Sequence, residues 1–259
     1  MITFMQPNDL SAIRHSLAHL LAAAVLEKYP EAKLAIGPVI EHGFYYDMDF
    51  SAYGGNAEQR GTNADKRGIS ASDLPMLENR MREFARGDLI FEGSEISTEE
   101  AREMFANQPY KMELIDDLVR ENQKITIYRT LPQDSASVQR SSAFVDLCRG
   151  GHVKTTEEID PDAFALTHIA GAYWRGDEKN AMLTRVYGLA FNTKEELKTY
   201  VTQLEEAKKR DHRKLGKELD LFTFSPLVGA GLPLWTPKGT LVREELDNFV
   251  WSLRKARGY

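Results

Sequence analysis

Apolar and polar positions near the start of the chain predict one helix followed by two strands. In residues 8–30, leucine, alanine and valine recur three and four positions apart, which is the spacing of one helix face. Residues 34–50 contain two short apolar and aromatic runs around a turn signal, and such runs are typical of strands. Residues 51–70 are rich in glycine, asparagine and charge and exceed the about 12–15 residues of an ordinary loop, so we expect a mobile surface insertion there.

The middle of the chain carries helix signals first and strand signals afterwards. Ser72 is a candidate cap for a helix that ends near Arg86, and Ser97 with Glu100 has the spacing of a capping box. Residues 111–122 predict a further helix. Beyond them, β-branched and aromatic residues alternate with polar ones, which indicates an antiparallel sheet. Its expected strands lie in residues 124–130, 143–148, 163–169 and 181–191.

The last part of the chain is strongly charged and then rich in turn residues. Thr193 and Glu196 form a second capping box, which opens a long charged helix expected to run to about Leu219. A turn-rich segment and a final helix, 240–259, follow. We therefore expect an α+β protein with an antiparallel sheet and packed helices, and a domain boundary close to the end of the charged helix.

Composition places the chain among ordinary globular proteins. Of its 259 residues, 42% are apolar and 28% are charged, a balance found in proteins that bury a sizeable core. The net charge of −6 argues against a broad surface for nucleic acid, although residues 208–217 hold six lysines and arginines and one aspartate. The single cysteine, Cys148, excludes an internal disulfide framework and fits a reducing cytosol. Since the sequence shows no secretory signal and no membrane span, we expect a cytoplasmic protein.

Two histidine-containing pairs have the same spacing. His15 and His19 lie four residues apart, so a helix projects both imidazoles from one face. Such a pair alone is weak evidence, because a helical histidine is more often an ordinary core or surface residue. Cys148 and His152 repeat the spacing in a loop with two glycines, which allows both side chains to turn inward. Together the four residues suit either a zinc site or a metal-free pocket that activates water.

Several longer motifs resemble one family of enzymes. The segments HSLAHLL, IGPVIEHGFYYD, VDLCRGGH and HIAGAYWRGDEKNAMLTRVYG, in this order, are similar to the editing domain of bacterial threonyl-tRNA synthetases. The segment LEEAKKRDHRKLGKELDLF resembles the linker helix of the same enzymes, and the resemblance covers about residues 10–259. The two histidine-containing pairs also occur in the related alanyl-tRNA editing proteins, so the pairs alone do not choose between the two families.

The resemblance implies an α+β fold with a two-part editing domain and a piece of a second domain. The editing domain would occupy residues 1–192, with sub-parts of about 1–65 and 66–192. Residues 193–219 would form the linker helix, and 220–259 would begin a truncated class II catalytic domain. The family's motif 2 and motif 3 arginines, which build the ATP site, have no counterpart here. Ligation of threonine to tRNA would therefore belong to a longer parent enzyme.

The resemblance also assigns site residues by position. Lys111 falls where the family has a lysine implicated in activating water, Tyr46 where it has an aromatic hydroxyl in the substrate pocket, and Asp146 where it has an acidic residue. Gly151 stands where the family usually has proline, which would loosen the loop around Cys148. The expected catalytic residues are His15, His19, Lys111, Asp146, Cys148 and His152, with Tyr46 binding substrate.

The resemblance implies hydrolysis of seryl-tRNA(Thr), in which serine is wrongly attached to threonine tRNA. Serine lacks only one methyl group of threonine. Losing that methyl contact lets the site that attaches the amino acid prefer threonine over serine by only about 10–200-fold. A second, smaller pocket that admits serine can remove the error. Cys148 would form a wall of this pocket, because an activated ester needs no acyl-enzyme. The acceptor end of tRNA(Thr) would be the partner, guided by the basic residues 208–217.

No cofactor is expected for such editing, and we do not favour zinc at His15, His19, Cys148 and His152. ATP, magnesium and zinc would serve the full-length parent, which is expected to be a homodimer, whereas this chain is expected to be a monomer. Two alternatives stay open. One is a free-standing zinc-dependent deacylase of the alanyl type, and the other is a module that binds tRNA without catalysis.

Overall fold

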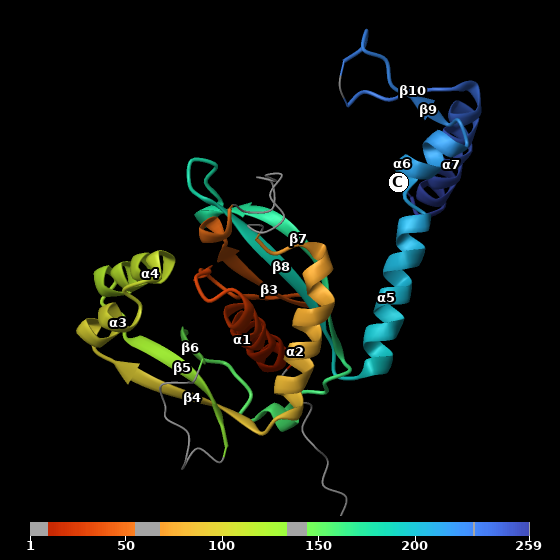
Figure 1. Ribbon diagram of the computed structural model, residues 1–259. Coiled ribbons are helices and arrows are strands. Elements are labelled where there is room, and N and C mark those ends of the chain that lie inside the picture. The colour runs from red at the N-terminus through yellow and green to blue at the C-terminus, as the bar shows by residue number, and fades with distance from the viewer. Residues whose placement is uncertain (1–9, 55–67, 134–143, 230, 259) are drawn as a thin grey trace, which may run out of the picture. The chain divides into compact units, whose positions relative to one another are not determined.

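The computed structural model describes residues 10–54, 68–133, 144–229 and 231–258, and the chain forms two compact units (Figure 1). The first unit ends at Leu197, and the second begins at Lys198, within helix α5 (Lys194–Lys209). Every candidate site residue belongs to the first unit. Most of the insertion expected at 51–70 lies outside the described residues.

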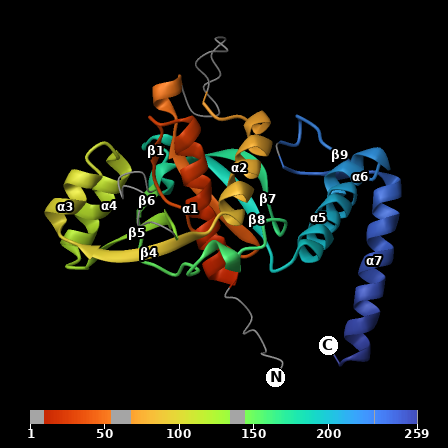
Figure 2. The same ribbon diagram turned by 60° about the horizontal axis from the view of Figure 1, so that its bottom comes forward.

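A five-stranded antiparallel sheet forms one part of the first unit. Its strands run in the order β1 (Lys33–Leu34), β3 (Gly43–Asp49), β8 (Met182–Ala190) and β7 (Phe164–Tyr173), and β2 (Val39–Ile40) also pairs with β3. Helices α1 (Leu10–Lys28) and α2 (Leu74–Arg86) lie side by side against this sheet (Figure 2). Alternate residues of a strand share one face, and Phe44, Tyr46 and Met48 of β3 are fully buried in the core beneath these helices.

A separate three-stranded sheet forms the other part of the first unit. Strands β4 (Leu89–Ile96), β5 (Ile125–Pro132) and β6 (Phe144–Leu147) pair antiparallel in that order, and helices α3 (Thr98–Met104) and α4 (Pro109–Arg120) connect β4 to β5. A small core of its own includes Phe105, Ile115 and Ile127. The prediction of one sheet over the later strands is therefore wrong, because β5 and β6 belong to this sheet and β7 and β8 to the other.

The larger sheet contains strands from both sides of the division expected near residue 65. Tyr46 of β3 is in register with Val186 of β8, so the larger sheet joins residues from both expected sub-parts. Two sheets, and not two consecutive stretches of sequence, define the parts of the first unit. The α+β class with antiparallel sheets and packed helices is confirmed. Strand β4 was not predicted, because Glu92, Gly93 and Ser94 interrupt its apolar pattern.

The charged helix predicted over 193–219 is divided into two. Helix α5 ends at Lys209, and the Asp211 side chain accepts a hydrogen bond from the Arg213 N–H at 2.8 Å, which caps α6 (His212–Glu218). Beyond α6 lie β9 (Phe222–Thr223), its antiparallel partner β10 (Leu234–Trp235) and α7 (Pro237–Ala256).

Capping boxes mark the chain ahead of α2 and the start of α3. Ser70, and not Ser72, forms a capping box with Asp73 ahead of α2, whereas the predicted box of Ser97 and Glu100 is confirmed at α3. Among the described residues, none of the helices combines the length and apolar character that a membrane crossing needs. Short 3-10 helices are η1 (Ser51–Tyr53), η3 (Ala71–Asp73), η5 (Thr156–Glu158) and η6 (Trp174–Gly176).

Candidate functional site

The two histidine-containing pairs meet at one place and form a quartet of His15, His19, Cys148 and His152. The first two lie on α1, and the other two lie at the end of β6 and in the loop after it. Cys148 Sγ lies 3.4 Å from His15 Nε2 and 3.2 Å from His152 Nε2. The potential ligand atoms of the quartet all fall within 4.8 Å of one another. Packing of α1 against the loop thus unites residues that the sequence separates widely.

Two glycines turn the loop back toward α1. Gly150 and Gly151 have φ angles of 101° and 88°, in the left-handed region that glycine adopts without strain. The Gly150 N–H also donates to Cys148 Sγ at 3.3 Å, so the loop holds the thiol. Proline, with φ near about −65°, could not adopt the conformation of Gly151. The loop of this chain therefore depends on glycine at that position.

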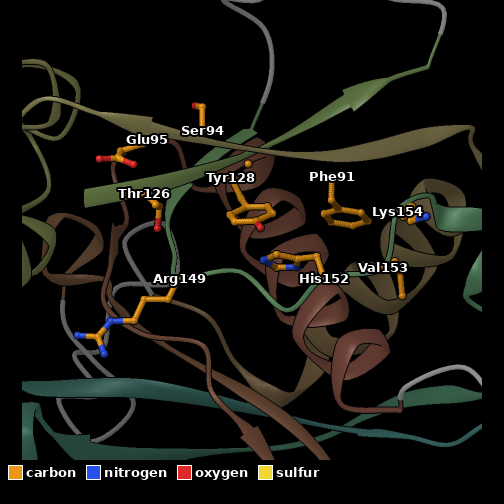
Figure 3. A pocket seen from close by; sticks show the side chains of 10 residues that line it. Phe91, Ser94, Glu95, Thr126, Tyr128, Arg149, His152, Val153 and Lys154 are labelled. Atoms are coloured by element: carbon orange, nitrogen blue, oxygen red, sulfur yellow. The ribbon is translucent and has the colours of Figure 1, made fainter. Parts of the chain in front are cut away.

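Aromatic side chains surround His152 (Figure 3). Its ring stacks on that of His15 with centroids 4.1 Å apart, and it lies parallel to the Phe91 ring at 5.3 Å. Tyr128 of β5 contacts the same imidazole at a centroid distance of 4.6 Å. The sequence did not single out Phe91 and Tyr128, because neither belongs to a recognisable motif. Only the pairing of β4 with β5 places them beside the loop.

A hollow of about 440 Å³ opens beside His152, over the β4–β5 pair (Figure 3). Its walls come from both strands and from residues 149–154, including the rings of Phe91 and Tyr128. Arg149 and Lys154 also line it with positive charge, and Glu95 lines it with a carboxylate. The hollow thus combines ring faces with cationic groups next to the quartet.

A buried ion pair lies next to the quartet. Lys111 Nζ of α4 and Asp146 Oδ1 of β6 lie 2.5 Å apart, and each side chain is only 3% exposed. The Tyr46 hydroxyl of β3 donates to Asp146 Oδ2 at 2.5 Å and accepts from Lys111 Nζ at 3.1 Å. His19 Nε2 lies 3.6 Å from the same carboxylate oxygen. The three residues assigned by resemblance therefore reach the quartet from three different elements.

The GAYWRGD segment holds α4, which carries Lys111, against the larger sheet. Trp174 Nε1 donates to the Glu113 carboxylate at 2.8 Å, and Arg175 Nη2 donates to Asp117 at 2.6 Å. Both acceptors lie on α4, whereas both donors follow directly after β7. These contacts tie the two sheets together and help to set the position from which the Lys111 ammonium reaches the site.

Burial keeps the site histidines neutral. Desolvation lowers the pKa of His15 below its usual 6.5 and lowers the pKa of His152 to about 2. Desolvation, followed by the nearby His15, places the pKa of His19 well below 6.5. Desolvation also raises the pKa of Cys148 to about 11. At neutral pH the imidazoles are therefore unprotonated, while the cysteine stays a thiol and is a poor nucleophile.

Acid is expected to destabilise the first unit through these histidines. In the unfolded chain an imidazole binds a proton below its usual pKa of 6.5, whereas in the folded state its pKa is lower. The unfolded state then binds more protons, so the free energy of unfolding falls as pH decreases below about 6.5, and the histidine contribution is constant above it. Urea unfolding at about pH 7.5 and about pH 5.5 in a chelating buffer measures the loss. Between these two pH values, the free energy of unfolding of His152→Gln should fall by less than that of wild type. An equal fall in both proteins would contradict this expectation.

The quartet also has the chemistry of a zinc site. Zinc binds histidine nitrogen at about 2.0–2.1 Å and cysteine sulfur at about 2.3 Å, so neighbouring ligand atoms of a tetrahedral site lie about 3–4 Å apart. The sulfur–nitrogen distances of 3.2 and 3.4 Å match this range. His19 Nδ1 is buried and has no hydrogen-bond partner in the described part of the chain. The residues present therefore fit a metal ion, although the thiol would have to lose its proton on binding.

Comparison with known proteins identifies the domain around the loop. Residues 125–187 match the family described as the threonyl and alanyl tRNA synthetase second additional domain. The sequence is 44% identical over 259 residues to a threonine--tRNA ligase of Rubrobacter xylanophilus, covering 100% of this chain and 36% of that protein. A threonine--tRNA ligase of Geobacter sp. (strain M21) is 46% identical over 260 residues, with 100% and 36% covered. One of Borreliella burgdorferi is 45% identical over 246 residues, covering 95% of this chain and 38% of that protein.

The chain spans little more than a third of the length of these relatives. The similarity nevertheless runs along essentially the whole chain, and the matched domain contains Cys148, His152 and Asp146. On this similarity along the whole chain, the chain belongs to the threonine--tRNA ligase family as a region of such a protein, and this region includes the second additional domain.

Proposed function

We propose that the chain hydrolyses seryl-tRNA(Thr) and thereby removes serine wrongly attached to threonine tRNA. The observation that carries this proposal is the meeting of the quartet with Lys111, Asp146 and Tyr46 in one largely buried polar site. Neutral imidazoles beside a fixed ammonium suit ester hydrolysis by water. An imidazole can accept the water proton, and the ammonium can stabilise negative charge that develops on the ester oxygen.

Each residue has a separate role in the proposed reaction. A water molecule held near Lys111 attacks the ester carbonyl carbon, and His15 accepts the proton that the water loses. The bond between this carbon and the ribose oxygen then breaks, and the imidazolium returns its proton to that oxygen, which releases serine and tRNA. Asp146 and Tyr46 hold the Lys111 ammonium in place. Cys148 stays a thiol and forms a wall of the pocket.

The hollow beside the quartet supports a tRNA end as the ligand. Phe91 and Tyr128 offer ring faces on which a base can stack, and Arg149 and Lys154 offer charge for phosphate groups. These are the two interactions that single-stranded nucleic acid uses most widely, and the 3′ end of tRNA is single-stranded.

Deacylation of seryl-tRNA(Thr) and threonyl-tRNA(Thr) by the 259-residue chain tests the proposal. We expect the seryl ester to be hydrolysed at least about tenfold faster, because a pocket that fits a hydroxymethyl group excludes the additional methyl group of threonine. Equal rates on the two substrates, or no hydrolysis above the spontaneous rate, would overturn the proposal.

We propose that this hydrolysis requires no metal, although the quartet could hold zinc, which would polarise the ester carbonyl. The protein is expected to keep its full rate on seryl-tRNA(Thr) after treatment with EDTA and to contain far less than stoichiometric zinc. Elemental analysis of wild type and Cys148→Ser measures the metal content. Stoichiometric zinc that is lost in Cys148→Ser, together with activity that EDTA removes, would contradict the expectation.

Two other functions are kept as alternatives. The matched domain is named after both threonyl and alanyl enzymes, so this match leaves open a free-standing zinc-dependent deacylase of the alanyl type. The threonine--tRNA ligases match far beyond residues 125–187, which favours the threonyl assignment. A preference for seryl-tRNA(Ala) would support the alanyl alternative. Binding of tRNA without hydrolysis would support a non-catalytic module.

Properties of the complete enzyme extend the proposal. Residues 1–192 would form the editing domain, and residues 193–219 would form the linker helix. Residues 220–259 would begin the class II catalytic domain, which would ligate threonine to tRNA and would use ATP, magnesium and zinc. We expect the complete enzyme to be a homodimer and this chain a monomer, both in the cytoplasm. The six lysines and arginines of 208–217 would guide the acceptor arm of tRNA(Thr).

A further inference from the structure

Ser16 lies between the two site histidines of α1 and is fully buried. Its Oγ accepts a hydrogen bond from the Val153 backbone N–H at 3.1 Å and lies 3.2 Å from His152 Nδ1. One hydroxyl therefore joins α1 to both the imidazole and the backbone of the Cys148–His152 loop. The reaction proposed above gives this residue no role.

The hydrogen bonds at Ser16 favour one direction of donation. A serine hydroxyl has one hydrogen to donate and two lone pairs, of which Val153 occupies one. If His152 Nδ1 carried the imidazole hydrogen, Ser16 would accept twice. Its own hydrogen would then have no acceptor among the described residues, and an unsatisfied buried donor is costly. The arrangement that satisfies every group has Ser16 donating to an unprotonated Nδ1.

We propose that Ser16 is a positioning residue that fixes His152 as the tautomer with its hydrogen on Nε2. The Nε2–H then donates to Cys148 Sγ at 3.2 Å, and the Cys148 S–H points to His15 Nε2 at 3.4 Å. The Val153 N–H thus sets the direction of a hydrogen-bond chain that ends at the unprotonated nitrogen of His15. Its catalytic meaning rests on the proposed function: when this nitrogen accepts the water proton, the thiol hydrogen turns to the Gly150 carbonyl oxygen, which lies 4.0 Å from Cys148 Sγ.

The same tautomer distinguishes metal-free from metal-bound chemistry. A zinc ion bound through His152 Nε2 would require the imidazole hydrogen on Nδ1, which would then donate to Ser16. The direction of the Ser16–His152 hydrogen bond is therefore opposite in the two cases, and a measurement of the tautomer separates them.

Nitrogen-15 NMR of the imidazoles in the full chain, combined with seryl-tRNA(Thr) deacylation, tests this role. In chelator-treated wild type we expect His152 with a protonated Nε2 and an unprotonated Nδ1. Ser16→Ala is expected to populate both tautomers and to lower kcat about 10- to 100-fold with KM little changed, by analogy with the loss that follows when the partner that orients a metal-bound histidine is removed. Ser16→Thr retains a hydroxyl and should keep the wild-type spectrum and most of the rate.

Ser97→Ala provides a matched control, because it removes a capping hydroxyl from α3 outside the site. It should lower stability without changing the His152 spectrum or kcat. A wild-type His152 protonated on Nδ1, or a folded Ser16→Ala with unchanged spectrum and rate, would overturn the proposal. If Ser16→Ala does not fold, the wild-type spectrum still decides the direction. The predicted tautomer in a wild type that hydrolyses no seryl-tRNA would refute the proposed function and leave the hydrogen-bond assignment standing.

Discussion

Replacing Lys111 with methionine is expected to destabilise the first unit by about 3–5 kcal/mol, the loss typical when one partner of a buried ion pair is removed. Both side chains of the pair are 3% exposed, so Asp146 would keep its charge in the interior without the ammonium. Hydrolysis of seryl-tRNA(Thr) should fall to the spontaneous rate, because the group that we propose holds the water is lost. The double variant Lys111→Met/Asp146→Asn should regain most of the stability, since no uncompensated charge remains, but none of the activity.

Urea unfolding followed by the fluorescence of Trp174 measures this loss. Trp174 is buried in the first unit, and replacing the two tryptophans of the second unit with phenylalanine leaves it as the sole reporter. Lys124→Met is the control, because it breaks an ion pair with Glu95 that is exposed, and such pairs contribute little. If Lys111→Met were as stable as this control, the buried pair would not stabilise the fold in the way expected.

His15→Ala is expected to lower kcat for seryl-tRNA(Thr) by about 10²–10⁴-fold, the contribution typical of a general base. Its Nε2 is the nitrogen that faces Cys148 in the open part of the quartet, and the side chain is partly exposed. Removing the ring takes away its stacking on His152 but leaves the buried Lys111–Asp146 pair in place, so KM should be nearly unchanged. Single-turnover deacylation with enzyme in excess separates the rate of the chemical step from the affinity for tRNA.

His168→Ala is the matched control for this variant. His168 lies on β7 with its exposed ring stacked on Tyr187 at 4.4 Å, so the substitution also removes a stacked imidazole, but away from the quartet. We expect the control to keep the wild-type rate. A wild-type rate in His15→Ala would exclude His15 as the base, and equal losses in both variants would point to a general effect on stability.

Local signals in the sequence determined the helices and the two pairs of the quartet. The capping box of Ser97 and Glu100 lies where it was predicted, because such a cap involves only one turn of chain. The spacing of His15 and His19 placed both on one helix face for the same reason. Local signals also had limits within a helix. The break at Asp211 was missed, since a capping aspartate inside a charged run resembles any other charged residue.

Tertiary structure decided which of these parts meet. Pairing of β3 with β8 and of β4 with β5 divides the first unit into two sheets, and packing of α1 against the loop closes the quartet. Phe91, Tyr128 and Ser16 became site residues only through these contacts. Strand pairing and burial depend on apolar faces that come together across long stretches of chain, and no spacing within the sequence encodes such a partner. The sequence by itself therefore determined the chemical groups of the candidate site, and the fold determined which of them become neighbours.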